Sequence, residues 1–63
     1  MATLQKAISI NQQARTAIEN GDYVTGQDLI RELEYLKETA DSLDEADVIA
    51  EFINDRWEQS EAN

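Results

Sequence analysis

Five carboxylates recur in the last third of the chain at intervals of three or four residues: Asp44, Asp47, Glu51, Asp55 and Glu58. Carboxylates can exchange protons, ligate hard metal ions or attract cationic side chains. Acid–base catalysis by two carboxylates needs a pocket that raises the pKa of one of them. The chain carries fourteen acids on 63 residues, so most of them must be solvated. The spacing therefore indicates a charged helix face that could hold a cationic partner.

The residue types on which most catalytic and metal sites depend are missing. The chain has no His and no Cys, which removes the usual base of a Ser or Thr nucleophile and the usual zinc ligands. Its only glycines, Gly21 and Gly26, form no phosphate-binding loop. The acids of residues 41–47 lack the glycine and the oxygen spacing of an EF-hand. We therefore expect no enzyme, no cofactor and no metal site.

The net charge of −9 is distributed unevenly along the chain. Residues 1–18 carry only Lys6 and Arg15 and sum to +2, whereas residues 19–63 carry every acid and sum to −11. Nucleic-acid binding needs clustered Lys and Arg, so strong acidity favours a basic protein partner instead. Like charges four residues apart also destabilise a helix, and a cationic partner would relieve that cost.

Apolar residues recur with helical spacing and predict an all-α fold. The expected structure is a small bundle of two to three helices joined by tight turns, with the helices at roughly 3–20, 25–41 and 43–59. Residues 1–63 would form a single small helical domain, with residues 60–63 frayed.

Short polar signals mark the ends of these helices. Gly21 suits a helix stop, and Thr25 is the expected N-cap of the second helix. Ser42 and Glu45 have the spacing of a capping box at the start of the third helix.

An alternative remains for the beginning of the chain. Leu4, Ile8 and Ile10 lie at even-numbered positions, as in a strand with one apolar face. This alternative predicts a short strand at residues 4–10, followed by helices.

A further motif lies at the expected turn between the first and second helices and continues into the second helix. The segment 20–36 contains a small residue, Gly, a polar residue and Tyr, followed by Thr, an acid, two aliphatic residues and Arg. The residues in question are Gly21, Tyr23, Thr25, Asp28, Leu29, Ile30 and Arg31. In this order the segment resembles the turn of ribbon-helix-helix antitoxins of the ParD type. The resemblance implies a dimer whose N-terminal strand, here residues 6–10, reads DNA. It also implies an acidic C-terminal part that wraps a basic toxin.

Two sets of residues are candidates for packing and for binding. Apolar residues at helical spacing predict the core or an oligomer interface. These are Leu29, Leu33, Leu36, Ile49 and Ile53. The partner-binding candidates are the acids of the third helix with the apolar residues beside them. They are Asp44, Asp47, Val48, Glu51, Phe52, Asp55, Trp57 and Glu58. Phe52 and Val48 lie off the main apolar stripe, so Phe52 is the expected exposed anchor, while Trp57 suits the core and the anchor role equally.

These features predict a non-catalytic acidic module that neutralises or regulates a basic protein, an antitoxin-like inhibitor being its most concrete version. The alternatives are a DNA mimic that inhibits a nucleic-acid-binding enzyme and a structural homo-oligomer. Nucleic acid would be bound only through an N-terminal strand, and a homodimer is compatible with the leucine stripe. No segment approaches the roughly 18 apolar residues of a membrane span, so we expect a cytoplasmic protein and no membrane partner.

Overall fold

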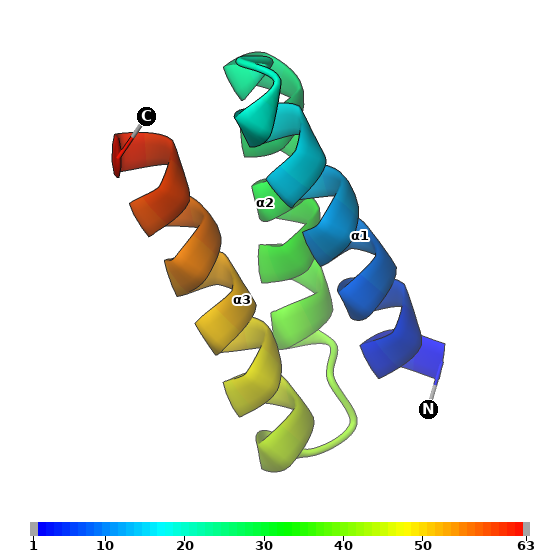
Figure 1. Cartoon of the computed structure of the whole chain (residues 1–63). Helices are drawn as coiled ribbons and strands as arrows, with labels where there is room; N and C mark the ends of the chain where they lie inside the picture. The colour runs from blue at the N-terminus through cyan, green and yellow to red at the C-terminus, as the bar shows by residue number, and fades with distance from the viewer. Residues whose placement is uncertain (1, 63) are drawn as a thin grey trace.

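A computed structural model describes residues 2–62 as three helices: α1 (Ala2–Glu19), α2 (Tyr23–Glu38) and α3 (Leu43–Ala62). The predicted all-α bundle is confirmed. Successive helices run in opposite directions, so α1 and α3 point the same way and the C-terminus lies at the end with the α1–α2 turn (Figure 1). The bundle measures 32 × 17 × 13 Å, which makes it about one helix long and two helices wide.

The alternative of an N-terminal strand is wrong, because residues 4–10 belong to α1. A strand would place Ile8 and Ile10 on the same face, but Ile10 is buried and Ile8 is 42% exposed. Instead, Ala7, Ala14 and Ile18 are buried at helical spacing along the whole of α1. Small alanines on this face let the neighbouring helices approach closely, and they favour helix over strand.

The turn between α1 and α2 is shorter than the sequence suggests. Gly21 adopts a φ of +81°, and the N–H groups of Gly21 and Asp22 donate to the carbonyls of Ile18 and Ala17, which is a Schellman ending. The Asp22 carboxylate then accepts from the Thr25 N–H at 3.3 Å. Asp22 is therefore the N-cap and α2 begins at Tyr23, so the predicted cap at Thr25 is wrong. Asp22 can act as the cap because the positive φ of Gly21 turns the chain immediately before it.

The turn between α2 and α3 follows the predicted capping signal in part. The Ser42 hydroxyl accepts from the Glu45 N–H at 3.2 Å, as in a capping box. The Glu45 carboxylate turns inward instead of completing the box, and the residue is only 6% exposed. At the other end, α3 continues to Ala62, and the fraying of residues 60–63 stays a prediction. Asn63, the last residue of that prediction, lies outside the described residues.

The core lies between the first half of α1, the second half of α2 and the first half of α3. Its buried members are Ala7, Ile10, Leu33, Leu36 and Ile49, and Leu29, Ala40, Phe52 and Ile53 pack against them. All five residues predicted for the core or an oligomer interface are therefore in or against this cluster. Leu33 and Ile49 are fully covered by the chain's own bundle, so the leucine stripe offers little surface for self-association.

Near the α1–α2 turn, α1 and α2 pack very closely. A Cβ added at Gly26 would lie 2.8 Å from the Cγ1 of Ile18, closer than carbon atoms normally approach. Ile18 and Ile30 are both almost inaccessible at this end. The two helices thus form a tight hairpin, against which α3 packs along one side.

Candidate partner-binding face

The five predicted acids of α3 all lie on its outer face. Asp44, Asp47, Glu51, Asp55 and Glu58 are exposed. The opposite face of the same helix carries the buried Ile49 and Glu45. This arrangement follows from the sequence, because steps of three and four residues keep one helix face in register. We call these five residues the acidic row.

The acidic row has no basic counterpart within the described part of the chain. The ion pairs of residues 2–62 join Arg15 to Glu19 and Arg31 to Asp28, each within a single helix. Within the row, only Glu58 has a side-chain hydrogen bond, which it accepts from the Asn54 amide at 3.4 Å. The row is therefore a line of solvated negative charge whose repulsion the fold leaves uncompensated.

The dimensions of the acidic row follow from helix geometry. Asp44 and Glu58 are fourteen residues apart, which is about 21 Å at about 1.5 Å per residue. The four intervals along the row therefore average about 5 Å each. A row of charge of this length, which zigzags along one helix face, is long enough to contact about four turns of another helix.

Two apolar side chains border the acidic row on opposite sides. Val48 and Trp57 are each 37% exposed, and nine residues of helix place them about half a turn apart. Both are partner-binding candidates that a docked protein could contact at the edge of the row. Trp57 is not part of the buried core, although its ring is substantially covered.

Phe52 is not the exposed anchor that the sequence suggests. It is half-buried and packs against the core cluster. The reason is the true direction of the inner face of α3, which runs through Glu45, Ile49 and Phe52. The face that meets α1 and α2 is therefore rotated toward Phe52 and away from Trp57, and Glu45 lies on the same inward side.

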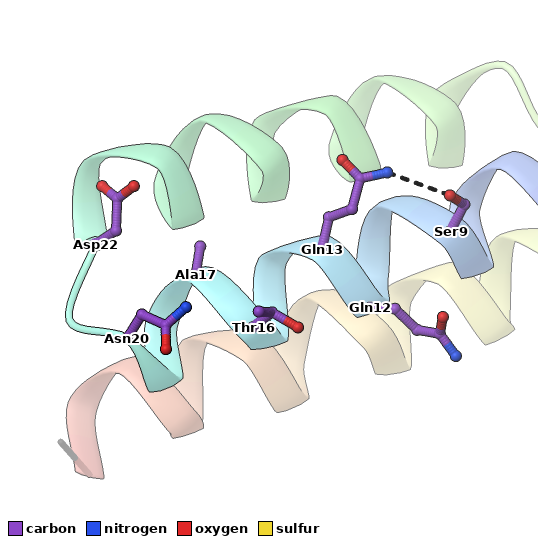
Figure 2. Close-up of a pocket in the computed structure, with 7 residues that line it drawn as sticks. All are labelled: Ser9, Gln12, Gln13, Thr16, Ala17, Asn20 and Asp22. Atoms are coloured by element: carbon purple, nitrogen blue, oxygen red, sulfur yellow. Dashed lines mark hydrogen bonds between the residues drawn. The ribbon is translucent and has the colours of Figure 1, made fainter.

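The outer face of α1 has a different character. It carries an open surface hollow of about 510 Å³ near the α1–α2 turn, seen along α1 in Figure 2. Most of its lining consists of uncharged polar side chains. The residues are Ser9, Gln12, Gln13, Thr16, Ala17, Asn20 and Asp22. Gln13 donates to the Ser9 hydroxyl at 3.2 Å, and Asp22, the only ionisable group here, already caps α2. The hollow offers hydrogen bonds to solvent but no pair of groups suited to proton transfer.

The sequence interpretation missed a polar strip on the inner face of α3. Arg56 and Gln59 are half-buried there, and the Gln59 amide donates to the backbone carbonyl of Arg15 on α1 at 3.2 Å. Asn11, which interrupts the apolar stripe of α1, is also half-buried one turn before Arg15. In the sequence, the sign of this polar strip is Asn11, a polar residue within the apolar stripe of α1. Its partners could not be identified without knowing how α1 and α3 are aligned.

Comparison with known proteins identifies no relative: no protein-family model, no curated protein and no solved structure matches the chain. Among residues 2–62, no helix is long and apolar enough to span a membrane. The same residues contain no group of three or more acids, His or Cys placed to hold a metal ion.

Proposed function

We propose that this protein is a non-catalytic binding module that docks a basic protein on the outer face of α3 and thereby neutralises or regulates it. The observation that carries the proposal is the acidic row, five exposed carboxylates on one helix face without a basic neighbour in ion-pair range within residues 2–62. Surfaces that serve solubility alone usually mix charges of both signs. Cationic side chains from a partner would remove the repulsion within the row and gain charge-assisted contacts.

The period of the acidic row favours a helix as the docked element. Lys or Arg residues on one face of an α-helix recur every three or four residues, or about 5 Å, which matches the row. Alternate residues of an extended strand recur about every 6.6 Å, so after four intervals such a strand would be about one position out of step. A basic amphipathic helix can therefore pair with all five acids at once. Val48 and Trp57 would contact its flanks.

The DNA-mimic alternative fits the row less well. Double-stranded DNA carries one negative charge per about 1.7 Å of axis, or about 3.4 Å per strand, which is denser than the row's spacing of about 5 Å. The outer face of α1, the other helix running in the same direction, adds no acid from residue 2 to residue 18. Asp28, Glu32, Glu34 and Glu38 add exposed acids on α2, so the alternative is weakened by the wide spacing of the row and by the acid-free outer face of α1, not by a lack of acids on other helices.

An antitoxin-like inhibitor remains the most concrete version of this proposal. In such a protein the acidic helix would cover the basic surface of a toxin. Reading DNA through an N-terminal strand is not part of the proposal, because residues 4–10 are helical. The proposal accordingly concerns the acidic C-terminal helix and its partner.

Two synthetic peptides of identical composition test the docking mode. In one, five Lys residues recur at steps of three and four in an alanine-rich helix, and in the other they occupy alternate positions. Titrated into ¹⁵N-labelled protein at low salt, the first should shift the amide signals of residues 44–58 and bind about tenfold more tightly, since only its charges match the row. Equal binding of both peptides contradicts helix docking. Failure of both to bind, or shifts centred on α1, contradicts the proposed site itself.

A further inference from the structure

We infer that residues 54–62, the second half of α3, undock from α1 as a unit while the remainder of the bundle stays folded. The inference concerns the inner face of α3 and is independent of what the acidic row binds. It rests on a contrast between the two halves of that inner face.

The first half of α3 is held mainly by apolar packing, although it also contains the buried Glu45, whose two carboxylate oxygens have no hydrogen-bond partner among residues 2–62. Ile49 is fully buried in the core cluster, and Phe52 and Ile53 pack against the same cluster. Separating this half from the bundle would expose a large apolar area, which is the main cost of local unfolding. Residues 43–53 should therefore open only when the whole bundle unfolds.

The second half of α3 presents polar groups to α1. From residue 54 to residue 62 no side chain is fully buried, and the half-buried ones are those of Arg56, Gln59 and Ser60. The opposing stretch of α1 contains Asn11 and Arg15. Apart from the Trp57 ring, which is 37% exposed, releasing this half exposes little apolar surface compared with the first half.

Several polar atoms in this contact are covered without being paired. The Nε of Arg56, the Oε1 of Gln59 and the Oδ1 of Asn11 each have less than 1 Å² of accessible surface and no hydrogen-bond partner among residues 2–62. The contact contains one side-chain hydrogen bond between helices, from Gln59 to the Arg15 carbonyl. Release returns all of these groups to bulk water, which repays part of the cost of breaking the contact.

Two states of α3 therefore lie close in free energy, one docked along its whole length and one with residues 54–62 free. Near Gly26, α1 and α2 contact each other directly, because Ile18 fills the space beside the glycine. A ligand that contacts both faces of the released residues 54–62 would bind the open state more tightly than the docked state. It would shift the equilibrium toward the open state in proportion to that difference in affinity. The released segment would then offer Trp57 and Gln59 together, which lie on different faces of the docked helix.

Amide hydrogen exchange with matched variants tests the inference. In the wild-type protein, amides of residues 56–60 should be protected at least about tenfold less than those of residues 49–53. The variant Arg56→Met/Gln59→Met replaces the covered polar groups by apolar side chains of similar length, so it should raise protection at residues 56–60 about tenfold. Amides of α1 and α2 should keep their protection, because opening is local.

A control separates undocking from ordinary fraying of a helix end. Asn54→Met places the same side chain on the exposed side of the same half of α3, where it cannot alter the contact with α1. It should change protection at residues 56–60 by less than about twofold. Equal effects of the two variants would show that fraying alone sets the exchange rates. Wild-type protection that is uniform along α3 would likewise overturn the inference.

Discussion

The outer faces of α1 and α3 are both exposed to solvent, but they carry different kinds of polar residue. Both helices run in the same direction along the bundle and expose one side to solvent (Figure 1). The α1 face uses Gln, Ser, Thr and Asn, including the residues that line its surface hollow. The α3 face uses five carboxylates in a row. A solvent-exposed helix face in this fold therefore does not require a row of acids, because the exposed side of α1 carries none before Glu19.

The difference between the two faces is the one that the proposed docking role of α3 predicts. Uncharged polar residues keep a helix face wet without self-repulsion, whereas aligned acids destabilise their own helix. The α3 face thus accepts a stability cost that the α1 face avoids.

The largest expected effect on stability comes from placing an acid on the buried side of α1 instead of its exposed side. Ala14→Asp would place a carboxylate at a position with 0% exposure beside Ile18 and Gly26, and should cost about 3 kcal/mol or more, enough to unfold a small domain. Gln12→Asp, on the exposed face, should change the free energy of unfolding by less than about 0.5 kcal/mol. Circular dichroism with urea titration measures both. A destabilising Gln12→Asp would mean that α1 lacks acids for structural reasons, and the comparison would fail.

A smaller effect should follow from relieving repulsion within the row. Glu51 lies four residues from both Asp47 and Asp55, so Glu51→Gln should stabilise the protein by about 0.4–1 kcal/mol at low salt. The gain should shrink at high salt, because exposed charges are screened. Urea unfolding at two salt concentrations measures it. Thr16→Gln on α1 provides the control and should show no salt-dependent change, and a loss of stability in Glu51→Gln would contradict the stated cost.

The smallest expected effect concerns the border of the row. Val48 is partly exposed and contributes little to the core, so Val48→Ala should lower stability by less than about 0.5 kcal/mol. The same change should weaken binding of a basic helical peptide about two- to threefold, since a docked helix would cover this side chain. If Val48→Ala clearly lowered the free energy of unfolding but left the affinity for the peptide unchanged, Val48 would stabilise the fold and would not contact the peptide.

The sequence predicted the parts of the structure that depend on periodicity. The three helices, the core residues Leu33 and Ile49, and the direction of the acidic row all follow from steps of three and four residues. The sequence did not predict which way Glu45 would turn, because a capping box leaves its carboxylate free to complete the box or to enter the interior. The inward position of Glu45 goes with a helix orientation in which Phe52 is half-buried and Trp57 lies at the edge.

The contact of Gln59 with α1 could not be predicted for a related reason. Its partner, the carbonyl of Arg15, lies 44 residues earlier in the chain. Only the lengths of both turns and the rotation of both helices bring the two together. Local sequence signals do not give these lengths and rotations. Helix α2 begins two residues earlier than the sequence predicts, with Asp22 as its cap, so even the length of the first turn was misjudged.

The most direct test of the docking role holds net charge constant while moving the changed charges. Asp47→Asn/Glu51→Gln/Asp55→Asn and Ser9→Lys/Gln12→Lys/Thr16→Lys each raise the net charge by three, from −9 to −6. Binding of the Lys-patterned helical peptide to wild type and both variants is measured by NMR titration at one low salt concentration. The α3 variant should bind about tenfold more weakly, and the α1 variant should stay within about threefold of wild type. Equal weakening by the two variants would show that total charge, not the acidic row, attracts the peptide.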